Sequence, residues 1–422
     1  MEAFETPFIA ITDAIASHAK WRPGKTALVC DDQRRTWAEF SDAVTRVANG
    51  LVNAELQRGE KVSLLMTNSI EMLEIMMGTV KAGGVIVPLS VMLTAESLAT
   101  MINDSDSRFV FADARFTRTI DSVRRDLINM LPDGLFVVGD ETEGWINYQS
   151  WRDGAGDEPA GVRLTPDDDF NLIYSSGTTG APKGIAHTHY ARQQSAYILA
   201  IEFHKKPEET TAAVWKDEAG HTYLRTGDIG KLDDDRSSKA VFGRRMNCAS
   251  SVPISLVSFP QKGSDFNPNE FLTIVERERC THTFMVPTQY IVTMEVPEFD
   301  RFDLSSLKVL LSAGAPLRAD TKTQMLQRFG GGVFELYGLT EGIATTLKPE
   351  EMEGKLSSVG TTVFGGDIRI IDDAGSEVPR GEAGEIVGYS SALMSGYWFP
   401  LHPRPEERHD PVRWRQRVSE RH

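Results

Sequence analysis

The chain has 422 residues, of which 41% are hydrophobic and 25% charged, as in ordinary globular proteins. This length predicts two or three globular domains of about 100–200 residues each. The formal net charge of −15 argues against a general nucleic-acid binder, which presents a basic surface. The cysteines, Cys30, Cys248 and Cys280, form no CxxC pair, and no stretch reaches the roughly 20 apolar residues of a membrane span. Without a secretory signal at its start, the sequence predicts a reduced, cytoplasmic protein.

Helix and strand patterns alternate through the first part of the chain. Thr36 and Glu39 have the spacing of a capping box, and the apolar residues that follow as far as Leu51 have helical spacing. A second helix is predicted over 72–81. Short apolar runs predict strands over 61–66, 85–89 and 109–112. This alternation predicts a parallel sheet covered by helices.

A further strand over 167–174 leads to a Gly-rich loop, and the alternation resumes after residue 271. Helices are predicted over 271–279 and 321–329, and strands over 307–312, 332–337, 367–373 and 384–388. Two stretches differ from this order. Residues 203–265 change character abruptly, and the tail from Arg404 has six arginines without Leu, Ile or Phe, which predicts disorder.

The Gly-rich loop, Tyr174-Ser-Ser-Gly-Thr-Thr-Gly-Ala-Pro-Lys-Gly184, has the composition of a phosphate-binding loop. Its glycines allow backbone amides to converge on an anion. Its hydroxyls and the Lys183 ammonium add donors to phosphate. The loop is not of the G-x-x-x-x-G-K-[ST] form, because no Ser or Thr follows the lysine. On its own, the segment could also be a flexible surface turn.

Two later segments, each after a predicted strand, strengthen the nucleotide interpretation. The small residues of 311–317 leave space for a flat ring at a strand end. In Glu335-Leu-Tyr-Gly-Leu-Thr-Glu341, Tyr337 could stack on a base, Thr340 could bind phosphate and Glu341 could hold Mg²⁺. Each of these residues alone is more often structural, but the three segments in this order are specific.

Together with 381–387 and the Ser-Gly-Tyr-Trp of 395–398, these segments resemble the adenylate-forming superfamily of acyl-CoA synthetases, luciferases and peptide-synthetase adenylation domains. The resemblance covers roughly 10–200 and 265–398. It implies an α/β fold, the N-terminal domain of an adenylate-forming enzyme. In that fold two β-sheets are layered with helices, and a small β-rich subdomain lies near 360–398.

The resemblance implies ATP-dependent activation of a small carboxylic acid, fatty or aromatic, to an acyl-adenylate. A thiol, usually of CoA as co-substrate, then displaces AMP. The implied catalytic residues are Lys183, Thr340 and Glu341, with Glu341 holding Mg²⁺. The implied nucleotide-binding residues are Ser175, Ser176, Gly177, Thr178, Thr179, Gly180, Lys183 and Thr340 at the phosphates, Gly314, Ala315 and Tyr337 at the adenine, and also Pro316 and Gly338. By the same resemblance, Asp228 in a Thr-Gly-Asp segment binds the ribose.

The sequence departs from the family pattern in two places. The segment with Asp228 precedes Tyr337, whereas the family has it after the Gly-Tyr-Trp element. The family's small C-terminal domain, with its late lysine, has no counterpart here. We therefore expect a first part of the AMP-binding domain at 1–202, a rearranged or disrupted segment at 203–265, a second part at 266–398 and an aberrant tail at 399–422. Either a rearranged, truncated gene product or a faulty reading of one would explain this order.

Several alternatives stay open at this point. A non-catalytic nucleotide-binding remnant is the main rival to an active ligase. A module that loads a carrier protein and a non-nucleotide scaffold are weaker rivals. His187 and His189, just past the loop, could include a catalytic base but are more often structural, and 284–290 could line an acyl pocket or be simple core. The acyl substrate and the oligomeric state are left undetermined.

Overall fold

The computed structural model describes residues 8–159, 161–175, 183–204, 214–216, 222–224, 230–232, 238–240, 256–258 and 266–398. The chain divides into two compact units, one of Met1–Ile198 with Ser255–His422 and one of Leu199–Ile254. In the second unit, β10 (Val214–Lys216) pairs antiparallel with β11 (Thr222–Leu224), and β12 (Gly230–Leu232) pairs antiparallel with β13 (Ser238–Ala240). All elements described below, apart from the end of α7, belong to the first unit.

The largest sheet has eight strands in the order β22-β9-β8-β4-β3-β5-β6-β7. Its strands are β3 (Lys61–Leu65), β4 (Val85–Pro88), β5 (Ser107–Asp113), β6 (Leu135–Val138), β7 (Ile146–Asn147), β8 (Asp169–Ser175), β9 (Lys183–Thr188) and β22 (Gly396–Tyr397). The pairs from β8 through β7 are parallel, whereas β9 is antiparallel to both β8 and β22. The predicted parallel sheet is therefore confirmed, with an antiparallel edge next to the Gly-rich loop.

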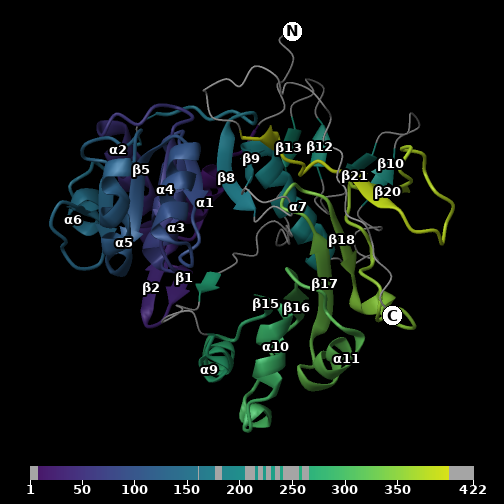
Figure 1. Ribbon diagram of the computed structural model, residues 1–422. Helices are drawn as coiled ribbons and strands as arrows, with labels where there is room; N and C mark the ends of the chain where they lie inside the picture. The colour runs from purple at the N-terminus through teal and green to yellow at the C-terminus, as the bar shows by residue number, and fades with distance from the viewer. Residues whose placement is uncertain are drawn as a thin grey trace. The chain divides into compact units, whose positions relative to one another are not determined.

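Both faces of this sheet are buried, which explains its continuous apolar strands. Along β5, Phe109 and Phe111 pack into one core cluster, and the alternate residues Val110 and Ala112 pack into another. Helices α2 (Trp37–Asn53), α3 (Ile70–Lys81) and α6 (Tyr148–Asp153) contribute to the first cluster, and α4 (Ala95–Asp104) and α5 (Thr117–Val123) to the second. Figure 1 shows these helices grouped around β5.

The predicted capping box at the start of α2 is confirmed. The Thr36 hydroxyl accepts a hydrogen bond from the Glu39 amide at 3.2 Å, and the Glu39 carboxylate accepts one from the Thr36 amide at 2.7 Å. This reciprocal pair satisfies two amides that the first helical turn leaves open. Nearby, α1 (Ile11–Trp21) packs beside a three-stranded sheet of β14 (Leu256–Ser258), β1 (Thr26–Cys30) and β2 (Gln33–Thr36).

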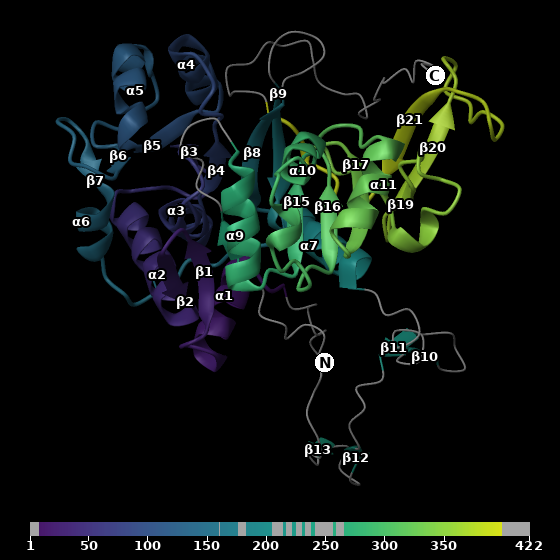
Figure 2. The same cartoon turned by 90° about the horizontal axis from the view of Figure 1, so that it is seen from below.

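A second large sheet has five strands in the order β15-β16-β17-β18-β19. They are β15 (His282–Met285), β16 (Val309–Ser312), β17 (Gly332–Gly338), β18 (Ala344–Leu347) and β19 (Thr361–Thr362). The first three are parallel and the last two antiparallel. Helices α9 (Pro268–Glu278), α10 (Pro287–Met294) and α11 (Ala319–Arg328) enclose its main apolar core (Figure 2).

The small β-rich part expected near 360–398 is built on one antiparallel pair of strands. Only β20 (Asp367–Ile371) and β21 (Glu385–Tyr389) form it, as an antiparallel pair. The other two strands of 360–398 join the large sheets: β19 pairs with β18, and β22 pairs with β9. β19 and β22 have only two residues each, so the sequence does not indicate which sheet they join. The remaining helix, α7 (His189–His204), follows β9, and among the described residues no helix has the length and apolar character to cross a membrane.

Candidate active site

Lys183, Glu341 and Tyr397 come from three separate elements and meet at one place. Lys183 opens β9, Glu341 follows β17, and Tyr397 lies in β22. The Tyr397 hydroxyl lies 3.5 Å from the Glu341 carboxylate, and the Lys183 ammonium lies 5.1 Å from the centre of the Tyr397 ring. Two of the predicted catalytic residues are thus brought together by a tyrosine that the sequence analysis did not assign to the site.

The turn after Thr340 buries the Glu341 carboxylate. Gly342 has a φ of +105°, and its amide bonds back to the Leu339 carbonyl at 3.0 Å. The Glu341 carbonyl accepts a hydrogen bond from the Met394 amide at 2.8 Å. This left-handed turn, which glycine adopts without strain, presses the chain against 390–394 and leaves Glu341 5% exposed.

The groups around Glu341 shift the pKa of its carboxyl in opposite directions. Burial raises the pKa of its carboxyl, whereas the hydrogen bond from Tyr397 and the charge of Lys183 act in the other direction. Burial and the nearby carboxylate raise the pKa of Tyr397 to about 12, so its hydroxyl stays protonated and donates. A partly desolvated carboxylate beside a cation is suited to bind a metal ion that also contacts phosphate.

The ends of the Gly-rich loop are fixed by strand pairing and by the Gly-Tyr-Trp element. Ser175 pairs with Lys183 across β8 and β9, so both ends of the loop lie at the same end of this strand pair. The Trp398 amide donates to the Gly184 carbonyl at 2.7 Å, and its indole donates to the Asp104 carbonyl at 2.7 Å. The Lys61 ammonium lies 3.6 Å from the Trp398 ring centre. Trp398 therefore anchors the base of the loop to the first sheet.

The predicted adenine-site residues lie just after β16 and at the end of β17, two adjacent parallel strands. Ser312 at the end of β16 pairs with Glu335 in β17, which places Gly314 and Tyr337 at the same edge of the five-stranded sheet. Gly314 has a φ of +84°, and it is exposed together with Ala315 and Pro316. Open backbone at the carboxyl ends of parallel strands is the usual place for a ligand in α/β proteins.

Several predicted site residues lie outside the described residues. They are Ser176, Gly177, Thr178, Thr179 and Gly180 of the loop, and Asp228. The described part of the loop consists of its two ends, Tyr174–Ser175 and Lys183–Gly184, with Lys183 exposed. Of the remaining predictions, Thr340 and Gly338 are exposed beside the buried Glu341.

The two histidines after the loop differ in their surroundings. His187 is buried, and its Nε2 lies 2.8 Å from the Thr340 carbonyl oxygen. His189 is also buried, and its ring meets Phe170 edge-on at 5.2 Å. From the sequence, both histidines are more often structural than catalytic. The bond from His187 to the Thr340 carbonyl has no sequence signal, because 153 residues separate the two residues.

Within the described part of the chain, no group of three or more His, Cys, Asp or Glu side chains has the arrangement of a protein-only metal site. By itself, the Glu341 carboxylate would supply one oxygen ligand to a cation that is shared with a bound molecule. Mg²⁺ is commonly held in this way, by one or two carboxylates together with substrate phosphates. The residues present therefore fit Mg²⁺ that arrives with a nucleotide.

Known proteins resemble this chain in sequence and in fold. The AMP-binding enzyme family matches residues 15–225 and 241–398. Indoleacetate–CoA ligase of Aromatoleum aromaticum is 28% identical over 395 residues, which cover 93% of this chain and 72% of the relative. Long-chain-fatty-acid–CoA ligase FadD13 of Mycobacterium tuberculosis is 29% identical, covering 90% of this chain and 69% of the relative.

Two solved structures extend the likeness to the fold. The anthranilate CoA ligase AuaEII in complex with anthranoyl-AMP has a TM-score of 0.74 at 23% identity, covering 94% of this chain and 72% of that one. The N-terminal domain of FACL13 from Mycobacterium tuberculosis has a TM-score of 0.71 at 24% identity, covering 93% of this chain and 91% of that domain. The fold is therefore that of the N-terminal domain of adenylate-forming enzymes. With most of its length matched by the family, the chain belongs to the AMP-binding enzymes.

Proposed function

We propose that this chain activates a carboxylic acid with ATP and that the acyl group then passes to CoA, as an AMP-forming acid–CoA ligase. In the first half-reaction a carboxylate oxygen attacks the α-phosphorus of ATP, the bond to the β-phosphate oxygen breaks, and pyrophosphate leaves. In the second, a thiol attacks the acyl carbonyl and AMP leaves. ATP and CoA are the co-substrates of acid–CoA ligases, the curated relatives of this chain.

One observation carries the proposal: Lys183 and Glu341 converge beside Tyr397 at the end of the Gly-rich loop. Every reacting oxygen in the first half-reaction is negative, so the protein must hold these groups together and offset their charge. Lys183 supplies a cation at the departing phosphates. Glu341 supplies an oxygen ligand for Mg²⁺, which would neutralise phosphate charge when bound.

The other residues are given binding roles. Ser175 and the loop that follows it surround the phosphates, and Thr340 donates its hydroxyl to phosphate. Gly314, Ala315, Pro316, Tyr337 and Gly338 surround the adenine. The exposed backbone after β16 supports this assignment, because a flat ring can approach it closely.

The acid is proposed as a fatty or aromatic carboxylic acid. Relatives named for indoleacetate, 4-hydroxybenzoate and long-chain fatty acids are 27–29% identical to this chain. Their shared chemistry is a carboxylate on an apolar body.

The test is ATP–pyrophosphate exchange by the purified chain with a panel of aryl, arylacetic and fatty acids, followed by detection of the CoA thioester. We expect acid-dependent exchange, and Glu341→Gln should lower it by more than about 100-fold if the metal ligand is lost. Glu353→Gln, at an exposed glutamate, is the matched control and should exchange like the wild type. ATP binding without exchange on any acid would instead identify a nucleotide-binding remnant.

A further inference from the structure

His187 is enclosed by partners on both sides of its ring. Its Nε2 lies 2.8 Å from the Thr340 carbonyl oxygen, and its Nδ1 lies 3.2 Å from a guanidinium nitrogen of Arg192. The Asn171 amide nitrogen lies 3.4 Å from the same Nδ1. The side chain is 1% exposed. Three elements, β8, β9 and α7, thus supply a polar cluster beneath the turn that carries Thr340.

The partners determine which ring nitrogen carries the proton. Arg192 can only donate, and its Nε donates to the Asn171 carbonyl oxygen at 2.5 Å, which turns the Asn171 amide nitrogen toward His187. Nδ1 therefore faces two donors and must accept. The proton then resides on Nε2, which donates to the Thr340 carbonyl.

The buried position keeps this imidazole neutral. Burial is the main cause that lowers the pKa of His187, to about 4, and the charge of Arg192 lowers it further. A neutral ring with one fixed tautomer is a rigid donor at physiological pH. It is not available as a general base, because both ring nitrogens already have partners and the side chain is shielded from solvent.

The Thr340 carbonyl belongs to the peptide plane that precedes Glu341. The plane that follows it is also held, because the Glu341 carbonyl accepts from the Met394 amide at 2.8 Å. Both peptide planes around the Glu341 Cα are thus anchored, one from β9 and one from the 390–394 segment. Fixing these planes fixes the direction in which the Glu341 side chain leaves the backbone.

We propose that His187 is a positioning residue, which orients Thr340 and Glu341 toward the nucleotide through its hydrogen bond to the Thr340 carbonyl. This inference rests on the proposed function, because it gives Thr340 and Glu341 their roles at phosphate and Mg²⁺. His187 sits three residues past Gly184, at the far end of the same strand that Lys183 opens. β9 therefore positions Lys183, which opens the strand, and also Glu341, through the hydrogen bond of His187 to Thr340.

Three substitutions of His187 distinguish a hydrogen-bond donor to Thr340 from a side chain that only fills space. In His187→Gln the amide nitrogen can reach the former Nε2 position and donate to Thr340. In His187→Asn the shorter amide reaches only the former Nδ1 position. His187→Leu keeps apolar volume and removes both nitrogens. Each variant is compared with the wild type for kcat and KM in ATP–pyrophosphate exchange, for the Mg²⁺ dependence of ATP binding by calorimetry, and for melting temperature.

We expect the Gln variant to retain most of the wild-type kcat and Mg²⁺ dependence. The Asn and Leu variants should lose about 10- to 100-fold in kcat, the effect typical of removing a residue that orients a ligand group. Their KM for the acid should stay unchanged, and kcat is measured below the melting temperature of each variant, so that a smaller folded fraction does not account for the loss. Weaker Mg²⁺ dependence of ATP binding in Asn and Leu, but not in Gln, would support the same conclusion without turnover.

Equal kcat in the Gln and Asn variants, or wild-type kcat in the Leu variant, would overturn the inference and leave the proposed function intact. Failure of the Gln variant to fold would also overturn it, because the imidazole would then serve as core. A wild-type chain without exchange on any acid overturns the proposed function first, and the inference with it.

Discussion

Lys322 and Glu335 form an ion pair that is almost completely buried, with side chains 1% and 5% exposed. The Lys322 ammonium also donates to the Leu356 and Ser358 carbonyls at 2.7 and 2.9 Å. The other Glu335 oxygen accepts from the Leu317 amide at 3.0 Å. The pair therefore ties α11 and β17 to the backbone just after Gly314–Pro316, the proposed adenine loop.

Removing one partner of this pair should be costly, because the other charge is left buried without compensation. We expect Lys322→Met to destabilise the protein by about 3–5 kcal/mol. Urea unfolding monitored by tryptophan fluorescence would measure this change. Lys322→Met combined with Glu335→Leu should recover most of the loss, since no unpaired charge remains. A single variant as stable as the wild type would contradict the paired arrangement.

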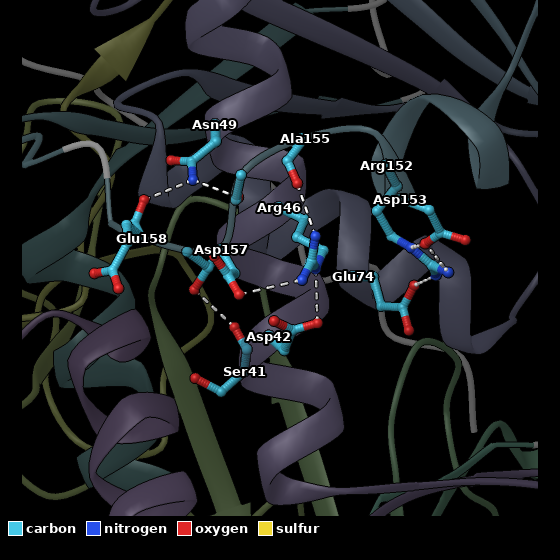
Figure 3. A network of polar contacts seen from close by, with 12 residues as sticks. Ser41, Asp42, Arg46, Asn49, Glu74, Arg152, Asp153, Ala155, Asp157 and Glu158 are labelled. Atoms are coloured by element: carbon cyan, nitrogen blue, oxygen red, sulfur yellow. Dashed lines mark hydrogen bonds and ion pairs between the residues drawn. The ribbon is translucent and has the colours of Figure 1, made fainter.

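A second buried charge, Glu74 in α3, is held by three side chains. It accepts from the Tyr148 hydroxyl and from Arg152 at 2.8 Å each, and from Arg35 at 3.3 Å. Figure 3 shows Arg152 of α6 directed at Glu74. Tyr148→Phe removes one bond to a carboxylate and should cost about 1.5–3 kcal/mol of stability. Tyr389→Phe, at an exposed tyrosine, is the control and should melt at the wild-type temperature.

The local patterns of the sequence are sufficient to predict most of the elements around the site. The capping box at Thr36 and the apolar runs of β3, β4, β5, β16 and β17 follow from short-range preferences. The five-stranded sheet is predicted less fully, since β18 and β19 are short and depend on partners. The motif residues Lys183 and Glu341 are recognisable because their segments occur in a specific order.

The rest of the candidate site depends on contacts between distant parts of the chain. Tyr397 meets Glu341 only because β22 pairs with β9, across more than 200 residues. Lys322 resembles any surface lysine in sequence, since α11 is polar along most of its length, and only the fold buries it. His187 carries no sequence signal that separates a donor to Thr340 from a core histidine. Tertiary hydrogen bonds of this kind leave no periodic pattern.

The neutral His187 predicts a pH-dependent stability. Its pKa is about 4 in the folded chain against 6.5 as the ordinary value, with Arg192 as the charged group that faces it. As pH falls below 6.5 the unfolded chain takes up this proton first, so the folded state loses up to about 3 kcal/mol by pH 4. His187→Gln should remove this component, which would flatten unfolding free energy against pH between 6.5 and 4. An unchanged slope would show that His187 does not cause it.

Gly342 should tolerate no side chain, because two independent constraints act on it. Its φ of +105° strains any L-residue, and an added Cβ would lie 2.3 Å from the Ala392 carbonyl oxygen, which is backbone and cannot move alone. We expect Gly342→Ala to destabilise the protein by about 3–5 kcal/mol. At permissive temperature it should also impair exchange, because the displaced 390–394 segment holds the Glu341 carbonyl.

Gly354 is the matched control, since its φ of +69° is also left-handed but an added Cβ there meets nothing within 4 Å. Gly354→Ala should cost only the backbone strain of about 1–2 kcal/mol and leave exchange unchanged. Thermal unfolding and ATP–pyrophosphate exchange measured on both variants separate the two effects. If Gly342→Ala were no worse than Gly354→Ala in both assays, the close contact between the Glu341 turn and Ala392 would not constrain the site.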